Sequence, residues 1–245
     1  MQNESSHLSV VIPAYNEEQR IGASLEKIVD YLAQQTYSYE ILVVEDGSTD
    51  GTLKLCRTFS AKYPRLRALH HETNHGKGCA VRNGMLAAEG EYILFCDADL
   101  ATPIEELDGF WPHMEQGADI VIASRALRSS HLEKRQPIYR EMAGRTFNLA
   151  VRALAVRGIH DTQCGFKLFK RDAARSVFSL CMLDDFGFDF EVLHIAQRLG
   201  FRIHEAPVHW YHRPGSKVKL LRDGFRMLAD LIRIRLRHRG LTKQG

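Results

Sequence analysis

The sequence predicts an α/β fold: a mostly parallel sheet flanked by helices, followed by a C-terminal amphipathic helix. Short apolar runs alternate with segments of helical periodicity over about the first 125 residues, which is typical of a doubly wound sheet. These runs are apolar on both faces, as expected of parallel strands buried beneath helices. Polar motifs follow directly after three of the strands. We therefore expect a site at one edge of the sheet.

The first half of this pattern begins with an apolar strand at Leu8–Pro13, ended by its proline. Apolar residues then recur at helical spacing over 21–32, and Glu40–Val44 forms the second strand. Asp50 is placed to act as the N-cap of the next helix. A short strand follows at Leu66–His70. These elements alternate as a βαβαβ unit requires.

The pattern continues with a helix over 77–89 and a strand at Tyr92–Cys96. Pro103 stands where a helix would begin, and Asp119–Ala123 is a further strand. In sheets of this kind, ligands bind outside the carboxyl ends of the strands. The loops after the strands that end near residues 13, 44 and 96 should therefore meet in a single site.

The second half is less regular. Residues 138–156 have a helical pattern, and the segment Asp161–Phe169 ends in a strand-like run. A helix is predicted at Asp189–Leu199, a strand at Phe201–Val208, and a long helix from Val218 to about Leu236. No linker separates these parts. We therefore predict one domain over residues 1–216 and a basic amphipathic helix over 217–245.

Composition narrows the class of protein. The chain has 245 residues, 44% of them hydrophobic and 26% charged, which suits a globular protein with a real core. Its five cysteines form no C-x-x-C pair, which argues against a zinc site or a disulfide framework. Neither a signal peptide nor an apolar run long enough to span a membrane is visible. These features favour a cytoplasmic location.

Positive charge is concentrated at the C-terminal end. Residues 213–245 hold ten Lys/Arg and two acidic residues, a net charge of +8, against −5 for the remainder. An apolar stripe runs along this segment through Val218, Leu221, Phe225, Leu228 and Ile232. Such a helix can lie on an anionic membrane surface, or it can pack on the domain with its arginines in water. A nucleic-acid partner is not expected, because the basic region lacks interleaved aromatic residues.

The strongest chemical motif is Asp97-Ala-Asp99, directly after an apolar strand. Two carboxylates two residues apart at a strand end can project to the same side. Hard oxygen ligands suit Mg²⁺ or Mn²⁺, and such an ion can neutralise the charge that develops on a leaving diphosphate. On its own, the tripeptide also fits a solvated turn.

Two further loops carry polar groups. Glu45-Asp-Gly-Ser48 follows the second strand, where carboxylates could bind a base or ribose, although an Asp-Gly turn needs no ligand. Asn74-His-Gly-Lys-Gly78 opens a helix, so its backbone N–H groups and its ammonium could meet a phosphate. Its spacing is neither that of a Walker A loop nor that of a Rossmann fingerprint.

Taken together, these motifs resemble a known family. Pro13-Ala-Tyr-Asn-Glu17 and the three motifs above follow in the order and spacing of family 2 glycosyltransferases, which have the GT-A fold. Four later segments resemble the polyprenyl-phosphate branch, especially the dolichyl-phosphate β-glucosyltransferases, with the dolichol-phosphate mannose synthases as close relatives. These segments are Asp161–Lys167, Phe188–Glu191, Glu205–Val208 and Pro214–Lys217.

The resemblance implies a role for each matching position. The donor nucleotide sugar would be bound by Pro13, Tyr15, Glu17, Asp46, Lys77, Asp97 and Asp99. The metal, Mg²⁺ or Mn²⁺, would be held by Asp97 and Asp99. The lipid phosphate would be bound by Arg125, Arg140, Arg213, Ser216 and Lys217. Asp189, counted with Asp97 and Asp99 among the catalytic residues, and Glu191 would lie near the sugar.

Two positions depart from the mannose synthases. They carry glutamine where this chain has Ala101, and serine where it has Gly144. Both differences favour UDP-glucose over GDP-mannose as the donor. The resemblance therefore implies an inverting hexosyltransferase that acts on a polyprenyl or dolichyl phosphate at the membrane surface. Because no membrane span is predicted, the enzyme would be peripheral or would depend on a membrane-protein partner.

Two other functions stay open on the sequence. A saccharide hydroxyl as acceptor would require a general base, for which Asp189 is the candidate, whereas a phosphate acceptor is already ionised at neutral pH. A non-catalytic protein that binds nucleotide sugars at a membrane surface is the third possibility. The intact Asp97 and Asp99 pair argues against it.

Overall fold

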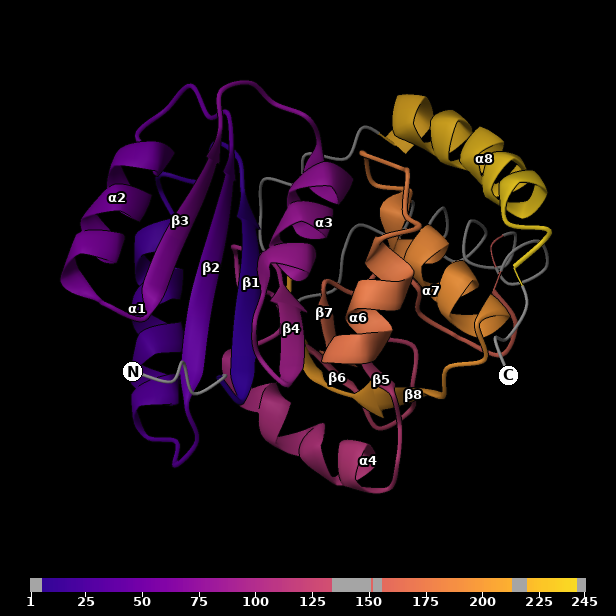
Figure 1. The fold of residues 1–245 in the computed structure, drawn as a ribbon, viewed down its shortest axis with the longest axis horizontal. Helices are drawn as coiled ribbons and strands as arrows, with labels where there is room; N and C mark the ends of the chain where they lie inside the picture. The colour runs from indigo at the N-terminus through magenta and orange to yellow at the C-terminus, as the bar shows by residue number, and fades with distance from the viewer. Residues whose placement is uncertain (1–5, 134–150, 152–155, 213–219, 242–245) are drawn as a thin grey trace.

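The computed structural model describes residues 6–133, 151, 156–212 and 220–241 (Figure 1). Seven strands form one sheet in the order β3-β2-β1-β4-β7-β5-β8, and β6 pairs with β9 in a separate two-stranded sheet. The strands are β1 (Leu8–Ala14), β2 (Tyr39–Asp46), β3 (Leu66–His71), β4 (Tyr92–Cys96), β5 (Ile120–Ser124), β6 (His131–Glu133), β7 (Phe166–Lys170), β8 (Ile203–Pro207) and β9 (His209–Tyr211).

The large sheet is mostly parallel, as the sequence predicts. β1 pairs in parallel with β2 and β4, β2 with β3, and β5 with β8. β7 is the exception, because it runs antiparallel to both of its neighbours, β4 and β5. The apolar pattern of a strand buried on both faces is the same in either direction, so the sequence carries no signal for this reversal.

Helices cover both faces of the sheet (Figure 1). They are α1 (Ile21–Ala33), α2 (Thr52–Lys62), α3 (Lys77–Ala87), the 3₁₀ helix η1 (Ile104–Gly109), α4 (Trp111–Glu115), α6 (Arg171–Phe178), α7 (Phe188–Arg198) and α8 (Leu220–Arg237). Alternate residues of β1 enter different cores: Val10 and Ile12 pack with α1, whereas Val11 packs with α3. The period of two along each strand thus builds one core on each face.

Several local predictions need adjustment. The segment after Pro103 begins as a 3₁₀ helix, and α6 is a helix that the sequence analysis did not predict. The N-cap of α2 is Gly51, one residue after the predicted Asp50. The Asp50 carboxylate still accepts a hydrogen bond from the Thr52 N–H at 2.9 Å. Asp50 therefore binds the N-terminus of α2, although it precedes the N-cap by one residue. The helix predicted over 138–156 lies almost entirely outside the described residues.

α8 packs on the domain, at the upper right of Figure 1. Its buried side chains include Met227, Leu231 and Ile234, which join the core beside α7. Of the predicted apolar stripe, Ile232 is the one residue whose side chain the structure describes, and it is 58% exposed. Among the described side chains of α8, Met227, Leu231 and Ile234 are therefore buried, whereas Ile232 and Leu236, the latter 61% exposed, lie on the outside.

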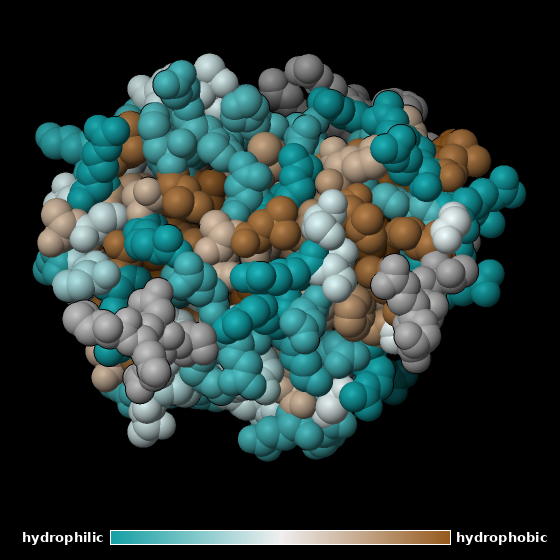
Figure 2. All heavy atoms as spheres, viewed as in Figure 1, coloured by the Kyte–Doolittle hydropathy of each residue, from teal (hydrophilic) through white to brown (hydrophobic). Residues whose placement is uncertain are grey.

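Figure 2 shows hydrophobic residues at the surface in the region of α8, among hydrophilic ones. Within the described ranges, no helix is both long enough and apolar enough to cross a membrane.

Candidate active site

The loops after β1 and β2 are joined to each other at the carboxyl edge of the sheet. The Asn16 N–H donates to Ser48 Oγ, and the Thr49 N–H donates to Asn16 Oδ1, each at 2.9 Å. The Glu17 N–H donates to Thr52 Oγ1 at 2.7 Å. Pro13, at the end of β1, and Tyr15 belong to the same corner. The two predicted donor-binding motifs are therefore neighbours in space.

Asp46 connects this corner to the glycine loop. Its carboxylate is 2% exposed and accepts the N–H groups of His75 and Gly76 at 3.0 and 2.8 Å. Asn74 Nδ2 and His71 Nδ1 contact the same carboxylate at 2.9 and 2.7 Å. Asp46 therefore anchors the loop that carries Lys77. Direct contact between Asp46 and a nucleotide stays a prediction.

Lys77 reaches the aspartate motif from the first turn of α3. Its Nζ lies 2.7 Å from Asp97 Oδ1 and is close to the rings of Phe95 and Phe188. Burial opposes the charged form, but the attraction of Asp97 and other carboxylates outweighs it, so the pKa of Lys77 is raised. The ammonium is thus a permanent positive charge beside Asp97.

Asp97 and Asp99 follow β4 as predicted, and their surroundings suit a cation. Burial and the nearby charge of Asp97 raise the pKa of Asp99. Two carboxylates that repel each other at a partly buried edge favour a divalent ion between them. Within the described part of the chain, no cluster of three or more His, Cys, Asp or Glu side chains could hold a metal by itself. A diphosphate and water are suited to supply further oxygen ligands to an ion held by the two aspartates.

Gly165 makes room for Asp97. A Cβ atom at Gly165 would lie 2.1 Å from Asp97 Oδ2, and the Asp97 N–H donates to the Gly165 carbonyl at 3.0 Å. The aspartate motif is therefore seated against the Asp161–Lys167 segment. The motifs of the first half of the chain and the later segments that resemble the polyprenyl-phosphate branch therefore meet at this contact.

Arg20 is a site residue that the sequence analysis missed. Its guanidinium contacts Glu17 at 2.7 Å and lies 3.9 Å from Asp99 Oδ2. Arg20 therefore adds a positive charge near Asp99, in addition to the Lys77 ammonium beside Asp97. A basic residue three positions after Glu17, at the start of α1, is the signal that could have indicated it.

Asp189 is buried and ion-paired. It lies in the first turn of α7, and its carboxylate accepts a hydrogen bond from the Lys167 ammonium, which also donates to the Cys164 carbonyl at 2.7 Å. Lys167 is 1% exposed. Burial raises the pKa of Asp189, although Lys167 and Lys77 oppose that shift. A lysine between Phe166 and Leu168 in the sequence is the signal that could have indicated a buried partner.

Arg125 follows β5 and is held in a two-pronged ion pair. Its Nε and Nη2 atoms donate to Asp161 at 2.6 and 2.9 Å, and its guanidinium lies 5.5 Å from the ring centre of Trp210. Attraction to Arg125 outweighs burial and lowers the pKa of Asp161. The guanidinium is therefore fixed in orientation. The other four predicted acceptor residues, Arg140, Arg213, Ser216 and Lys217, lie outside the described residues.

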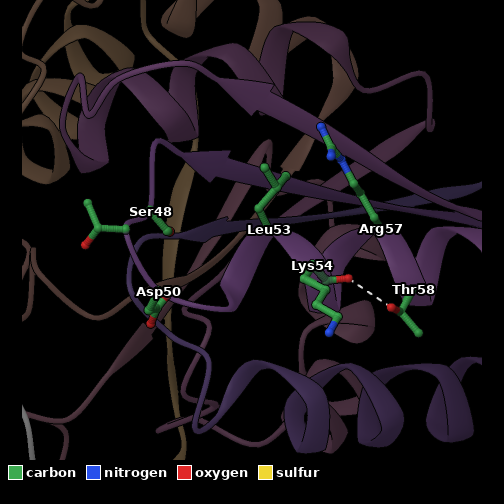
Figure 3. A pocket seen from close by; sticks show the side chains of 7 residues that line it. Ser48, Asp50, Leu53, Lys54, Arg57 and Thr58 are labelled. Atoms are coloured by element: carbon green, nitrogen blue, oxygen red, sulfur yellow. Dashed lines mark hydrogen bonds between the residues drawn. The ribbon is translucent and has the colours of Figure 1, made fainter.

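A hollow of about 580 Å³ lies beside the first two loops (Figure 3). Its walls come from the loop after β2 and the first turns of α2: Ser48, Thr49, Asp50, Leu53, Lys54, Arg57 and Thr58. It adjoins the donor corner but does not include Asp97 or Asp99. The predicted reacting groups, Asp97 and Asp99, therefore lie outside this hollow.

A parallel sheet whose carboxyl edge carries a carboxylate pair and a lysine-bearing glycine loop is the arrangement of a nucleotide-binding α/β enzyme. The family model "Glycosyl transferase family 2" matches residues 9–178, and the chain belongs to this family of glycosyltransferases. The resemblance drawn from the motifs is thereby confirmed.

Named relatives agree with this assignment. The dolichyl-phosphate beta-glucosyltransferases of Dictyostelium discoideum and Mus musculus are 36% and 39% identical to this chain. Each alignment covers 96% of this chain and 76% of the relative. The glucosyl-3-phosphoglycerate synthase of Mycobacterium tuberculosis, solved with Mn²⁺, UDP and glucosyl-3-phosphoglycerate, shares the GT-A fold at a TM-score of 0.66 and 23% identity. That match covers 98% of this chain and 82% of the synthase.

Proposed function

We propose that this glycosyltransferase moves glucose from UDP-glucose to a dolichyl or other polyprenyl phosphate, with inversion at the anomeric carbon. The observation that carries the proposal is the Asp97 and Asp99 pair beside Lys77, in a chain whose similarity to dolichyl-phosphate beta-glucosyltransferases extends over 96% of its length. A divalent cation held by the two aspartates would neutralise charge on the departing diphosphate.

The reaction follows from the charges at the site. A phosphate oxygen of the acceptor attacks C1 of the sugar, the bond from C1 to the diphosphate breaks, and its electron pair leaves with UDP. The acceptor is largely dianionic at pH 7, with a second pKa of about 6, so no general base is needed. Lys77 supplies positive charge where the diphosphate leaves. Asp189, already bound to Lys167, is suited to orienting the sugar.

Among the residues that the structure describes, we assign Arg125 to binding of the acceptor phosphate. Asp161 accepts hydrogen bonds from Nε and Nη2 and fixes the orientation of the guanidinium. Its remaining N–H groups can bind a phosphate in a paired geometry that lysine cannot reproduce. Arg125→Lys should therefore raise the KM for the lipid phosphate about tenfold and leave the KM for the donor unchanged. Arg128→Lys, at an exposed position three residues later, is the matched control. An equal change in both KM values for Arg125→Lys would contradict the assignment.

A lipid-transfer assay tests the proposed reaction. The protein is incubated with radiolabelled UDP-glucose, Mg²⁺ or Mn²⁺, and dolichyl phosphate in vesicles, and label is counted in the organic phase. We expect lipid-linked glucose with UDP-glucose, much less transfer from GDP-mannose, and none in the presence of a chelator. Donor turnover with a saccharide but not with the lipid would favour a hydroxyl acceptor, and binding without any turnover would favour a non-catalytic role.

The outer face of α8 supports the proposal that the enzyme works at a membrane surface. Ile232 and Leu236 are exposed there beside Arg233, whose side chain is also exposed. An exposed apolar pair within a basic helix suits an anionic interface. The same vesicles serve as the test, because sedimentation of the protein with anionic but not neutral vesicles is expected. Equal recovery in the supernatant with both would argue for a soluble enzyme or one recruited by a membrane protein.

A further inference from the structure

The segment 182–187, between α6 and α7, lies directly against the glycine loop that carries Lys77. The N–H groups of Gly78 and Cys79 both donate to the Asp184 carbonyl, at 2.7 and 3.2 Å. A Cβ atom at Gly78 would lie 2.3 Å from the Leu183 carbonyl oxygen. The two backbones are therefore in contact immediately after Lys77. A displacement of segment 182–187 would move the start of α3 and with it the Lys77 ammonium.

Glu191 of α7 holds this segment in place. Its side chain is fully buried, and its Oε2 atom accepts the N–H groups of Met182 and Leu183 at 2.9 and 2.8 Å. The resemblance to the family places Glu191 near the sugar. In the structure it acts as a buried acceptor for two backbone donors that have no regular secondary structure to satisfy them.

His238, at the end of α8, completes this arrangement. Its Nε2 atom lies 3.0 Å from Glu191 Oε1, and both side chains are buried. Because a carboxylate offers only acceptors, Nε2 of His238 carries the proton in this hydrogen bond. A second link from the same helix is the ion pair between Arg226 and Asp185 at 2.6 Å. α8 therefore contacts both the segment 182–187 and the residue that holds it.

We infer that Glu191 and His238 are positioning residues for Lys77, so that the C-terminal helix is part of the support of the donor site. The connection runs from His238 to Glu191, from there to the backbone of segment 182–187, and through Asp184 to Gly78. This inference rests on the proposed function only for the role of Lys77 at the donor diphosphate. The physical link between α8 and the glycine loop is independent of which sugar is transferred.

Amide hydrogen exchange at Gly78 and Cys79, combined with steady-state kinetics, tests the inference. His238→Leu removes the donor to Glu191 and keeps an apolar side chain of suitable size. We expect the Gly78 and Cys79 amides to exchange about tenfold faster, because a buried charge-assisted hydrogen bond is lost. The KM for the nucleotide sugar should rise by a similar factor, with the KM for the lipid phosphate unchanged. His238→Gln, which keeps an N–H donor, should restore much of both.

A variant on the buried face of α8 controls for a general loss of stability. Ile234→Ala removes apolar packing from the buried face of the same helix without touching Glu191, so it should lower the Tm and leave exchange at Gly78 and Cys79 as in the wild type. Wild-type exchange in a folded His238→Leu protein, or equal acceleration in Ile234→Ala, would overturn the inference. If UDP-glucose proves not to be the donor, the exchange result still stands, so failure of the proposed function is recognised separately.

Discussion

Asp97→Asn should lower the rate of glucosyl transfer about 10³-fold while leaving the protein folded. The substitution keeps the shape of the side chain and its place against Gly165, but it removes a charge that a divalent ion requires. Without the ion, the leaving diphosphate keeps its charge as the bond to C1 breaks, which is the largest electrostatic cost in the reaction.

The measurement has two parts, the transfer rate and the binding of Mn²⁺ by titration calorimetry in the presence of UDP. Both should fall together in Asp97→Asn. Asp30→Asn, an exposed position on α1, provides the matched control and should behave as the wild type. Retention of full activity by Asp97→Asn would remove the basis for the proposed site.

Lys167→Met should destabilise the fold by about 3–5 kcal/mol, because it leaves the carboxylate of Asp189 buried without its partner. Chemical denaturation measures this loss. Lys170→Met, in the same strand but in a half-exposed pair with Asp119, should cost no more than about 1 kcal/mol. The double variant Lys167→Met/Asp189→Leu should recover most of the stability but not the activity.

The loss in Lys167→Met should depend on pH with a definite sign. Burial already raises the folded pKa of Asp189 above its ordinary value of 3.8, and removing Lys167 raises it further. A raised folded pKa means that the native state binds the proton more tightly than the unfolded chain. The stability deficit should therefore be small in acid, where Asp189 is protonated, and grow as the pH rises through the folded pKa. A deficit that is constant with pH would show that lost packing, not the unpaired charge, causes it.

The local sequence pattern alone was enough to predict the sheet, its mostly parallel strands and the edge at which the motif-bearing loops meet. An apolar run followed by a polar loop indicates a strand whose end meets a ligand, and the loops after β1, β2 and β4 do lie together because these strands are parallel neighbours. These features depend on neighbours in sequence or on a topology that alternation already implies. The grouping of Lys77 with Asp97 and Asp99 came from the family resemblance, and the structure brings these residues together.

Tertiary structure decided which partner each buried polar group has. The antiparallel direction of β7 brings Lys167 to Asp189, and the packing of α8 on α7 brings His238 to Glu191. The sequence predicted an amphipathic helix in this region, but not that Met227, Leu231 and Ile234 would be its buried face. Each of these pairings joins residues far apart in the chain. Periodicity along the chain does not indicate such contacts. They form only when separate elements pack together and bury polar groups that must then find a partner.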